Sequence, residues 1–262
     1  MQEEKMHRST YRVLQIFELL SASPSGMSLT QLSQALDIPK GSLHPILKTM
    51  EAMNFIQAGK DGNYSIGQAS YFVGSSYTKN SDLLQEIDYV AKNISKTVNQ
   101  TVYFSVLSGG DVLYLLEERV QTPVTIQARR GYKFPAYSTG IGKALLSDTS
   151  LAELHALYPQ GLIKLTDYTI DNFDTLHDQL QKIQASGFSY EKEESNEGVQ
   201  CIAIPITYNH QVIAAMSIAT PVFYYSEDFE KKAQLALNKA RIEIEKLISD
   251  NIADWIYSPV SR

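Results

Sequence analysis

The start of one short helix near Ser28 constrains the fold of this chain more than any other part of its sequence. Ser28 and Gln31 have the spacing of a capping box, in which each side chain accepts a hydrogen bond from the other residue's backbone N–H. Met27 and Leu32 have the spacing of a hydrophobic staple across the same turn. The helical pattern stops about two turns later, before the proline of residues 37–39. Because so short a helix is not stable alone, it must pack against its neighbours.

The segments on both sides of this helix supply those neighbours. Residues 11–21 have an apolar helical period at Val13, Ile16, Phe17 and Leu20, and a third helix is predicted by the same period at Leu43, Ile46, Leu47 and Met50. Residues 54–67 then predict two short strands around a turn at residues 60–63. Three helices followed by a hairpin predict a winged helix-turn-helix domain over residues 1–67.

The polar face of the third helix and the hairpin turn form a candidate DNA-binding surface. Its residues are Lys40, Gly41, Ser42, His44, Pro45, Lys48 and Lys60. Such a face can enter a major groove, where His44 and Lys48 donate to base edges or phosphates and Ser42 donates to a phosphate. The alternative is the solvated polar face of a small helical bundle, but the complete helix-turn-helix with its wing favours DNA. Pro45 requires either that the helix starts late, near Ser42, or that it is kinked.

Residues 68–81 are predicted to be a linker helix, and residues 82–262 a second domain that starts with a long helix over 82–98. Beyond it the hydrophobic period switches between two and 3.6. Strands are expected at 101–107, 112–118, 124–128, 201–207 and 212–219, and helices at 139–147, 151–157, 173–186 and from 226 past 248. This order favours an α+β domain whose sheet is covered on one face and cupped by loops on the other, which would form a small-molecule pocket.

The segment from Pro135 to Ser147, PAYSTGIGKALLS, has the outline of a phosphate-binding loop but lacks its required residues. A Walker A loop needs a glycine five residues before its Gly-Lys pair and a hydroxyl residue after it, and these positions hold Tyr137 and Ala144. The third glycine of a dinucleotide fingerprint is replaced by Leu145. A nucleotide site is therefore not expected.

Two interpretations of the glycines in this segment remain. Ser138 or Thr139 can cap a helix whose first-turn amides, left uncovered by Gly140 and Gly142, accept an anion such as a carboxylate. Alternatively, the glycines let the helix pack closely on the sheet. In the first interpretation Lys143 lies outside the pocket.

The net charge of −6 is unevenly distributed. Residues 1–80 hold seven Lys/Arg and six Asp/Glu, a net charge of +1, so the remainder carries −7. This charge balance argues against a protein that coats nucleic acid non-specifically. It allows a small DNA-binding domain attached to an acidic remainder of the chain. The single cysteine excludes a disulfide scaffold, and neither a secretory signal nor an apolar run long enough for a bilayer is found. We therefore expect a cytoplasmic protein without membrane contact.

Several residues are of types that occur in catalytic or metal-binding sites. Cys201 could be a nucleophile, but no histidine lies near it in the sequence, and a buried free cysteine is usually a small hydrophobe. His155 and His177 lack ligand spacing to another His or Cys. The acidic run of Glu191, Glu193, Glu194 and Glu197 is expected to be a solvated loop. We expect no catalytic residue, metal or cofactor.

The ordered set of a winged helix-turn-helix, a linker helix, STGIGKALL, EKEESNEGVQCIAIPI and AAMSIATP resembles the IclR family of bacterial transcriptional regulators. The resemblance runs from about Ser9 to Ile248. It implies an N-terminal winged helix-turn-helix joined to a C-terminal GAF-like effector domain, and a homodimer or homotetramer. The implied effector-binding residues are Ile126, Phe134, Gly140, Ile141, Glu191, Val199, Cys201, Ser217 and Ala219. The family commonly has aspartate in place of Glu191 and more often a long side chain in place of Pro45.

The resemblance implies a DNA-binding transcriptional regulator, a repressor in preference to an activator, and not an enzyme. Its operator binding would be modulated by a small metabolite, for which an organic acid is expected. The alternative is a metabolite sensor that acts through protein contacts, with the winged helix as an interaction surface. An enzyme built around Cys201 and the carboxylates ranks third.

Overall fold

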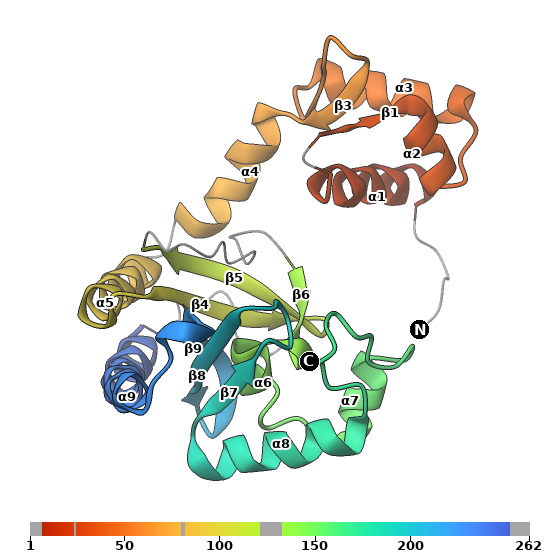
Figure 1. Cartoon of the computed structure of the whole chain (residues 1–262). Helices are drawn as coiled ribbons and strands as arrows, with labels where there is room; N and C mark the ends of the chain where they lie inside the picture. The colour runs from red at the N-terminus through yellow and green to blue at the C-terminus, as the bar shows by residue number, and fades with distance from the viewer. Residues whose placement is uncertain (1–6, 24, 80–81, 121–132, 252–262) are drawn as a thin grey trace. The chain divides into compact units, whose positions relative to one another are not determined.

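The computed structural model describes residues 7–23, 25–79, 82–120 and 133–251 and divides the chain into two compact units, 1–80 and 81–262 (Figure 1). None of the helices described is both long and apolar enough to span a lipid bilayer. Each unit has its own hydrophobic core. The predicted fold class, a winged helix-turn-helix followed by an α+β domain, is confirmed.

The first unit is a three-helix core with a small sheet. Its elements are α1 (Arg8–Ser21), β1 (Met27–Ser28), α2 (Leu29–Ala35), α3 (Lys40–Ala52), β2 (Ile56–Ala58), β3 (Asn63–Ile66) and α4 (Gln68–Lys79). The predicted capping box is present, since the Ser28 N–H donates to Gln31 Oε1 at 2.8 Å and the Gln31 N–H to Ser28 Oγ at 3.3 Å. The strands pair in the order β1-β3-β2, which makes the wing.

The start of α3 differs from the sequence prediction. The helix begins at Lys40, and the N–H groups of Ser42 and Leu43 already donate to the Pro39 carbonyl. A start near Ser42 is therefore wrong, and Pro45 lies inside the helix. Because proline has no N–H, Pro45 cannot donate to the Gly41 carbonyl four residues earlier.

The second unit is built on a six-stranded antiparallel sheet in the order β6-β5-β4-β9-β8-β7 (Figure 1). Its strands are β4 (Thr101–Ser108), β5 (Asp111–Glu118), β6 (Lys133–Pro135), β7 (Ser189–Lys192), β8 (Val199–Tyr208) and β9 (Gln211–Pro221). Its helices are α5 (Asp82–Val98), α6 (Gly140–Leu145), α7 (Leu151–Leu157), α8 (Phe173–Ser186) and α9 (Glu227–Asp250), with 3₁₀ turns η1 (Ala136–Ser138) and η2 (Val222–Tyr224).

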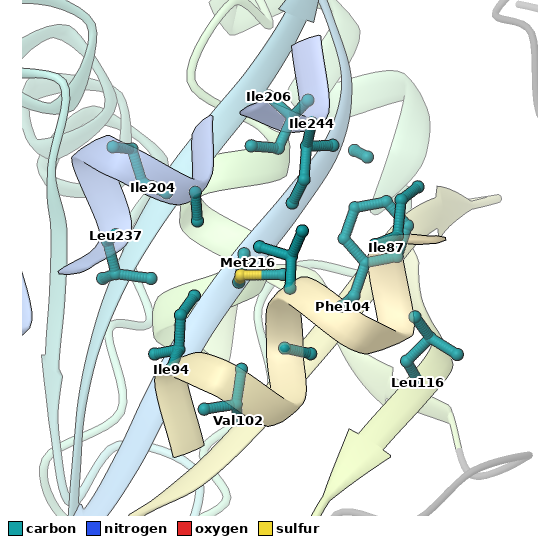
Figure 2. Close-up of a cluster of buried hydrophobic side chains, with 14 of the residues drawn as sticks. Ile87, Ile94, Val102, Phe104, Leu116, Ile204, Ile206, Met216, Leu237 and Ile244 are labelled. Atoms are coloured by element: carbon teal, nitrogen blue, oxygen red, sulfur yellow. The ribbon is translucent and has the colours of Figure 1, made fainter. Parts of the chain in front are cut away.

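Both faces of this sheet are covered by helices. On one face, side chains of α5 and α9 pack on large apolar strand residues such as Phe104 and Met216 (Figure 2). On the other face, η1, α6, α7 and α8 pack on smaller strand residues such as Ala203 and Ala215. The second face, expected to be cupped by loops, is covered mainly by helices, because the short strand side chains leave room for α6.

Two edge strands were not expected from the sequence. β6 has three residues and β7 four, and in β7 the buried positions are held by Ser189 and Glu191 rather than by apolar residues. Polar side chains on the buried face hide the alternation by which a strand is recognised. The strand predicted at 124–128 lies outside the described residues.

Candidate functional site

The predicted DNA-binding residues lie on the surface of the first unit. Along α3 the burial alternates, with Leu43, Leu47 and Met50 in the core. All seven candidates are exposed: Lys40, Gly41, Ser42, His44, Pro45, Lys48 and Lys60. Lys48 Nζ is 2.8 Å from Glu51 Oε2 on the same helix, an exposed ion pair that leaves two ammonium N–H groups for other acceptors.

The second unit contains a hollow between α6 and the sheet. Seven of the nine residues implied for effector binding lie around it: Phe134, Gly140, Ile141, Val199, Cys201, Ser217 and Ala219. Tyr103, Tyr114, Thr139, Ser195 and Asn196 complete the wall. Of the other two, Glu191 lies beside the wall, and Ile126 is outside the described residues. The cavity measures about 20 Å³, which is room for about one water molecule, so a ligand must displace part of the wall.

Small side chains on one sheet face create this hollow. Cys201 on β8 pairs with Ala219 on β9, and Tyr103 on β4 pairs with Ser217 on β9. The rings of Tyr103 and Tyr114 meet edge to face at 5.2 Å. Burial raises the pKa of both tyrosines, so their hydroxyls stay protonated and can donate or accept hydrogen bonds.

The two glycines of α6 have different structural roles. A Cβ on Gly142 would lie 2.2 Å from the Ala136 carbonyl oxygen, so Gly142 is required for close backbone packing against η1. A Cβ on Gly140 would point at the strands, 3.0 Å from Cys201 Cβ and 3.3 Å from Glu191 Cβ. The packing interpretation therefore holds for Gly142, while Gly140 is part of the cavity wall.

Thr139 is the N-cap of α6. Its hydroxyl accepts a hydrogen bond from the Gly142 N–H at 2.9 Å, as one of the two capping alternatives requires. Ser138, the other candidate, instead donates to the Pro135 carbonyl. The cap fixes the first turn of α6, and with it Gly140 and Ile141, at the cavity.

Glu191 is a buried carboxylate with only 2% of its surface exposed. It lies opposite Cys201 in the β7–β8 register. Burial raises the pKa of Glu191 to about 7, although two backbone N–H groups, from Ser195 at 3.2 Å and Glu194 at 2.5 Å, donate to its Oε1 and stabilise the charged form. Near neutral pH, Glu191 therefore exists in both protonation states.

The raised pKa of Glu191 predicts a pH-dependent stability. Above pH 4.5 the folded state binds more protons than the unfolded state, so the unfolding free energy falls as pH rises and levels off above about 7. The full loss is roughly 3 kcal/mol for this shift. We expect Glu191→Gln to match the wild type near pH 4 and to exceed it in stability at pH 8, as measured by urea unfolding. An equal pH dependence in both proteins would contradict this assignment.

The acidic run is not the solvated loop that the sequence suggested. Glu197 is exposed, but Glu191 and Glu194 are buried. Glu194 pairs with Lys143, whose Nζ is 2.5 Å from Glu194 Oε1 and 3.0 Å from Gln179 Oε1. Lys143 lies outside the cavity wall, as expected, but it is fully buried. Sequence alone could not reveal this pair, because its members are 51 residues apart.

The chemistry of Cys201 does not favour catalysis. Burial, followed by the nearby Glu191 carboxylate, raises the pKa of the Cys201 thiol well above its ordinary value. A thiol with a raised pKa is a weak nucleophile at neutral pH. In the part of the chain that the structure describes, no group of three or more His, Cys, Asp or Glu side chains could hold a metal ion.

The sequence prediction missed five wall residues. Thr139 was considered only as a helix cap. Tyr103 and Tyr114 reach the cavity through the strand register, which a single sequence does not specify. Ser195 and Asn196 belong to the acidic segment and gave no signal that distinguishes them from a surface loop.

Comparison with known proteins finds two family models that match separate parts of the chain. Residues 9–59 match the family model of the IclR helix-turn-helix domain, and residues 75–245 match that of the bacterial transcriptional regulator IclR C-terminal domain. The transcriptional repressor IclR of Escherichia coli (strain K12) is 29% identical over 226 residues, covering 84% of this chain and 82% of that protein. The regulator KdgR of Dickeya chrysanthemi is 28% identical over 230 residues, covering 86% and 75%.

Solved structures show the same fold. The IclR regulator of Alicyclobacillus acidocaldarius superposes with a TM-score of 0.81 at 18% identity, covering 93% of this chain and 99% of that one. An IclR homologue of Microbacterium hydrocarbonoxydans, solved with 4-hydroxybenzoate, gives a TM-score of 0.78 at 18% identity and covers 93% and 100%. The matched relatives are transcriptional regulators rather than enzymes. The chain belongs to the IclR family and is a DNA-binding transcriptional regulator with an effector-binding C-terminal domain.

Proposed function

We propose that this regulator is a repressor whose operator binding is modulated by a small organic acid bound in the α6 cavity. The observation that carries the proposal is the gathering of seven effector residues implied by the family around one hollow, although they come from separate segments of the chain. The repressor role is supported by the E. coli relative, which is named a repressor. The choice of an organic acid is supported by the Microbacterium homologue, which was solved with 4-hydroxybenzoate.

The polar groups of the cavity suit a carboxylic acid of modest size. Ser217, Ser195 and Asn196 offer hydrogen-bond donors, while Tyr103, Tyr114 and Phe134 provide an apolar and aromatic wall. Lys143 is already paired with Glu194, so its charge is not available to a ligand. Protonation of Glu191 removes a negative charge beside the cavity, which favours an anionic ligand.

We propose that the protein acts in the cytoplasm as a homodimer or homotetramer. Tyr71, Phe72 and Val73 are consecutive residues of α4 and are each more than 60% exposed. Exposed large apolar side chains on the surface of a helix are a natural contact for a second copy. Two copies would present two α3 helices to the two halves of a palindromic operator.

Ligand identity can be approached by thermal shift over sugar acids, keto acids and aromatic acids. A ligand that binds only the folded state raises the melting temperature with the logarithm of its concentration over its Kd. We expect at least one acid to stabilise the wild type and not Gly140→Val. An acid that stabilises both proteins equally would bind outside this cavity.

The proposed DNA-binding residues predict a strong salt dependence. If Lys40, Lys48 and Lys60 of two copies contact phosphates, operator affinity should fall by about 10³ between 50 and 200 mM salt. Lys48→Ala should weaken binding to all sequences and reduce the salt slope by about one unit per copy. Fluorescence anisotropy measures both quantities, and Lys239→Ala on α9 is the matched control. Salt-insensitive binding of a protein partner, unchanged by Lys48→Ala, would instead support the sensor alternative.

A further inference from the structure

The loop between β7 and β8, residues 193–198, forms one side of the α6 cavity. Ser195 and Asn196 from this loop are wall residues. The loop is a tight turn, in which the Glu193 N–H donates to the Val199 carbonyl and the Gly198 N–H to Glu193 Oε1. Its internal bonds set its shape, but its position over the cavity depends on contacts with the rest of the unit.

One such contact is the buried ion pair between α6 and the loop. Lys143 is fully buried, and its ammonium donates to Glu194 Oε1 from the loop and to Gln179 Oε1 from α8. A buried charge that loses its partner is strongly unfavourable. While the pair is intact, Glu194 is therefore held against α6 and cannot turn to solvent.

The loop backbone is fixed by a second set of contacts. Glu191 Oε1 accepts hydrogen bonds from the N–H groups of Glu194 and Ser195. On the carbonyl side, the hydroxyl of Thr166 donates to Glu193 O, and that of Thr169 donates to Glu194 O. Glu191 thus acts on the loop that carries the wall residues, and its own side chain is not part of the wall.

We propose that Lys143 is a positioning residue for effector binding, which holds the 193–198 loop over the cavity through Glu194. This inference rests on the proposed effector site. The cavity leaves room for about one water molecule, so a ligand enters only when part of the wall moves. The loop is the wall segment that this buried ion pair ties to α6. Loss of the Lys143 charge shifts the loop toward its open position and lowers the affinity for a ligand that needs the closed one.

The single cysteine of the chain is a built-in reporter of loop opening. Cys201 is a half-buried wall residue, so its reaction with 5,5′-dithiobis(2-nitrobenzoate), DTNB, measures access to the cavity. The Lys143 charge lowers the pKa of this thiol, so its removal alone would raise the pKa and slow the reaction. Faster labelling of Lys143→Met therefore reports opening and cannot arise from the lost charge.

We expect Lys143→Met in the full-length protein to react with DTNB at least about tenfold faster than the wild type. Lys164→Met, which removes an exposed lysine paired with Asp171, should react at the wild-type rate. Leu237→Ala on α9, a core variant distant in sequence from the loop, controls for general destabilisation. Equal or slower labelling of Lys143→Met, or acceleration no greater than that of Leu237→Ala at matched stability, would overturn the proposal.

Glu194→Gln provides a second variant if Lys143→Met does not fold, since it keeps the loop residue nearly isosteric. In Glu194→Gln, the backbone amides of residues 193–198 should exchange hydrogen faster than in the wild type, while those of β9 should exchange at the wild-type rate. Wild-type exchange rates in both segments would contradict the inference.

The proposed function has a separate readout. If none of the tested acids slows DTNB labelling of the wild type, the effector site is wrong, whereas the effect of Lys143 on loop opening is judged by the variants alone.

Discussion

A Gly142→Ala variant is expected to lose about 3 kcal/mol or more of unfolding free energy. The added Cβ would lie 2.2 Å from the Ala136 carbonyl oxygen and 2.5 Å from Ala136 Cα, and neither backbone atom can move without shifting η1. Urea unfolding followed by far-UV circular dichroism measures the loss. Gly74→Ala on α4 is the control, because its Cβ meets nothing within 4 Å and alanine favours a helix by up to about 1 kcal/mol. Wild-type stability of Gly142→Ala would contradict this account of α6 packing.

Gly140→Val is expected to abolish the effector response while leaving unliganded operator binding intact. Its Cβ would meet the Cβ atoms of Cys201 and Glu191 at 3.0 and 3.3 Å, and its methyl groups would occupy the hollow that the ligand needs. Ligand affinity should fall by about 100-fold or more, as expected when a small pocket is filled. Operator affinity without ligand should stay within about twofold of the wild type, because the first unit has its own core.

The local structure of both units could be predicted where local chemistry determines it. The capping box at Ser28 marks the start of α2, and α7 and α8 have the predicted bounds. The apolar period of residues 11–21 likewise predicted the helix α1, which starts three residues earlier. These signals act over three or four residues, so they can be read from a single sequence.

The features missed from the sequence depend on contacts between distant segments. In the sequence, Lys143 resembles a surface lysine and Glu194 is one member of an acidic run. Only the fold brings Lys143 Nζ to 2.5 Å from Glu194 Oε1. The short edge strand β7 buries Ser189 and Glu191, which reverses the expected pattern. Tyr103 enters the cavity wall because β4 pairs with β9 in one register. The family resemblance named seven of the twelve wall residues, and the other five required the structure.

The central claim is that a ligand in the α6 cavity changes operator binding. It is tested most directly by measuring operator affinity of full-length wild type and Gly140→Val by fluorescence anisotropy, with and without the acid that gives the largest thermal shift. We predict that the acid changes wild-type affinity by at least about tenfold, within the usual range of allosteric coupling, and leaves the variant unchanged. The same response in both proteins, with equal affinity for operator without acid, would place the effector elsewhere and contradict the account.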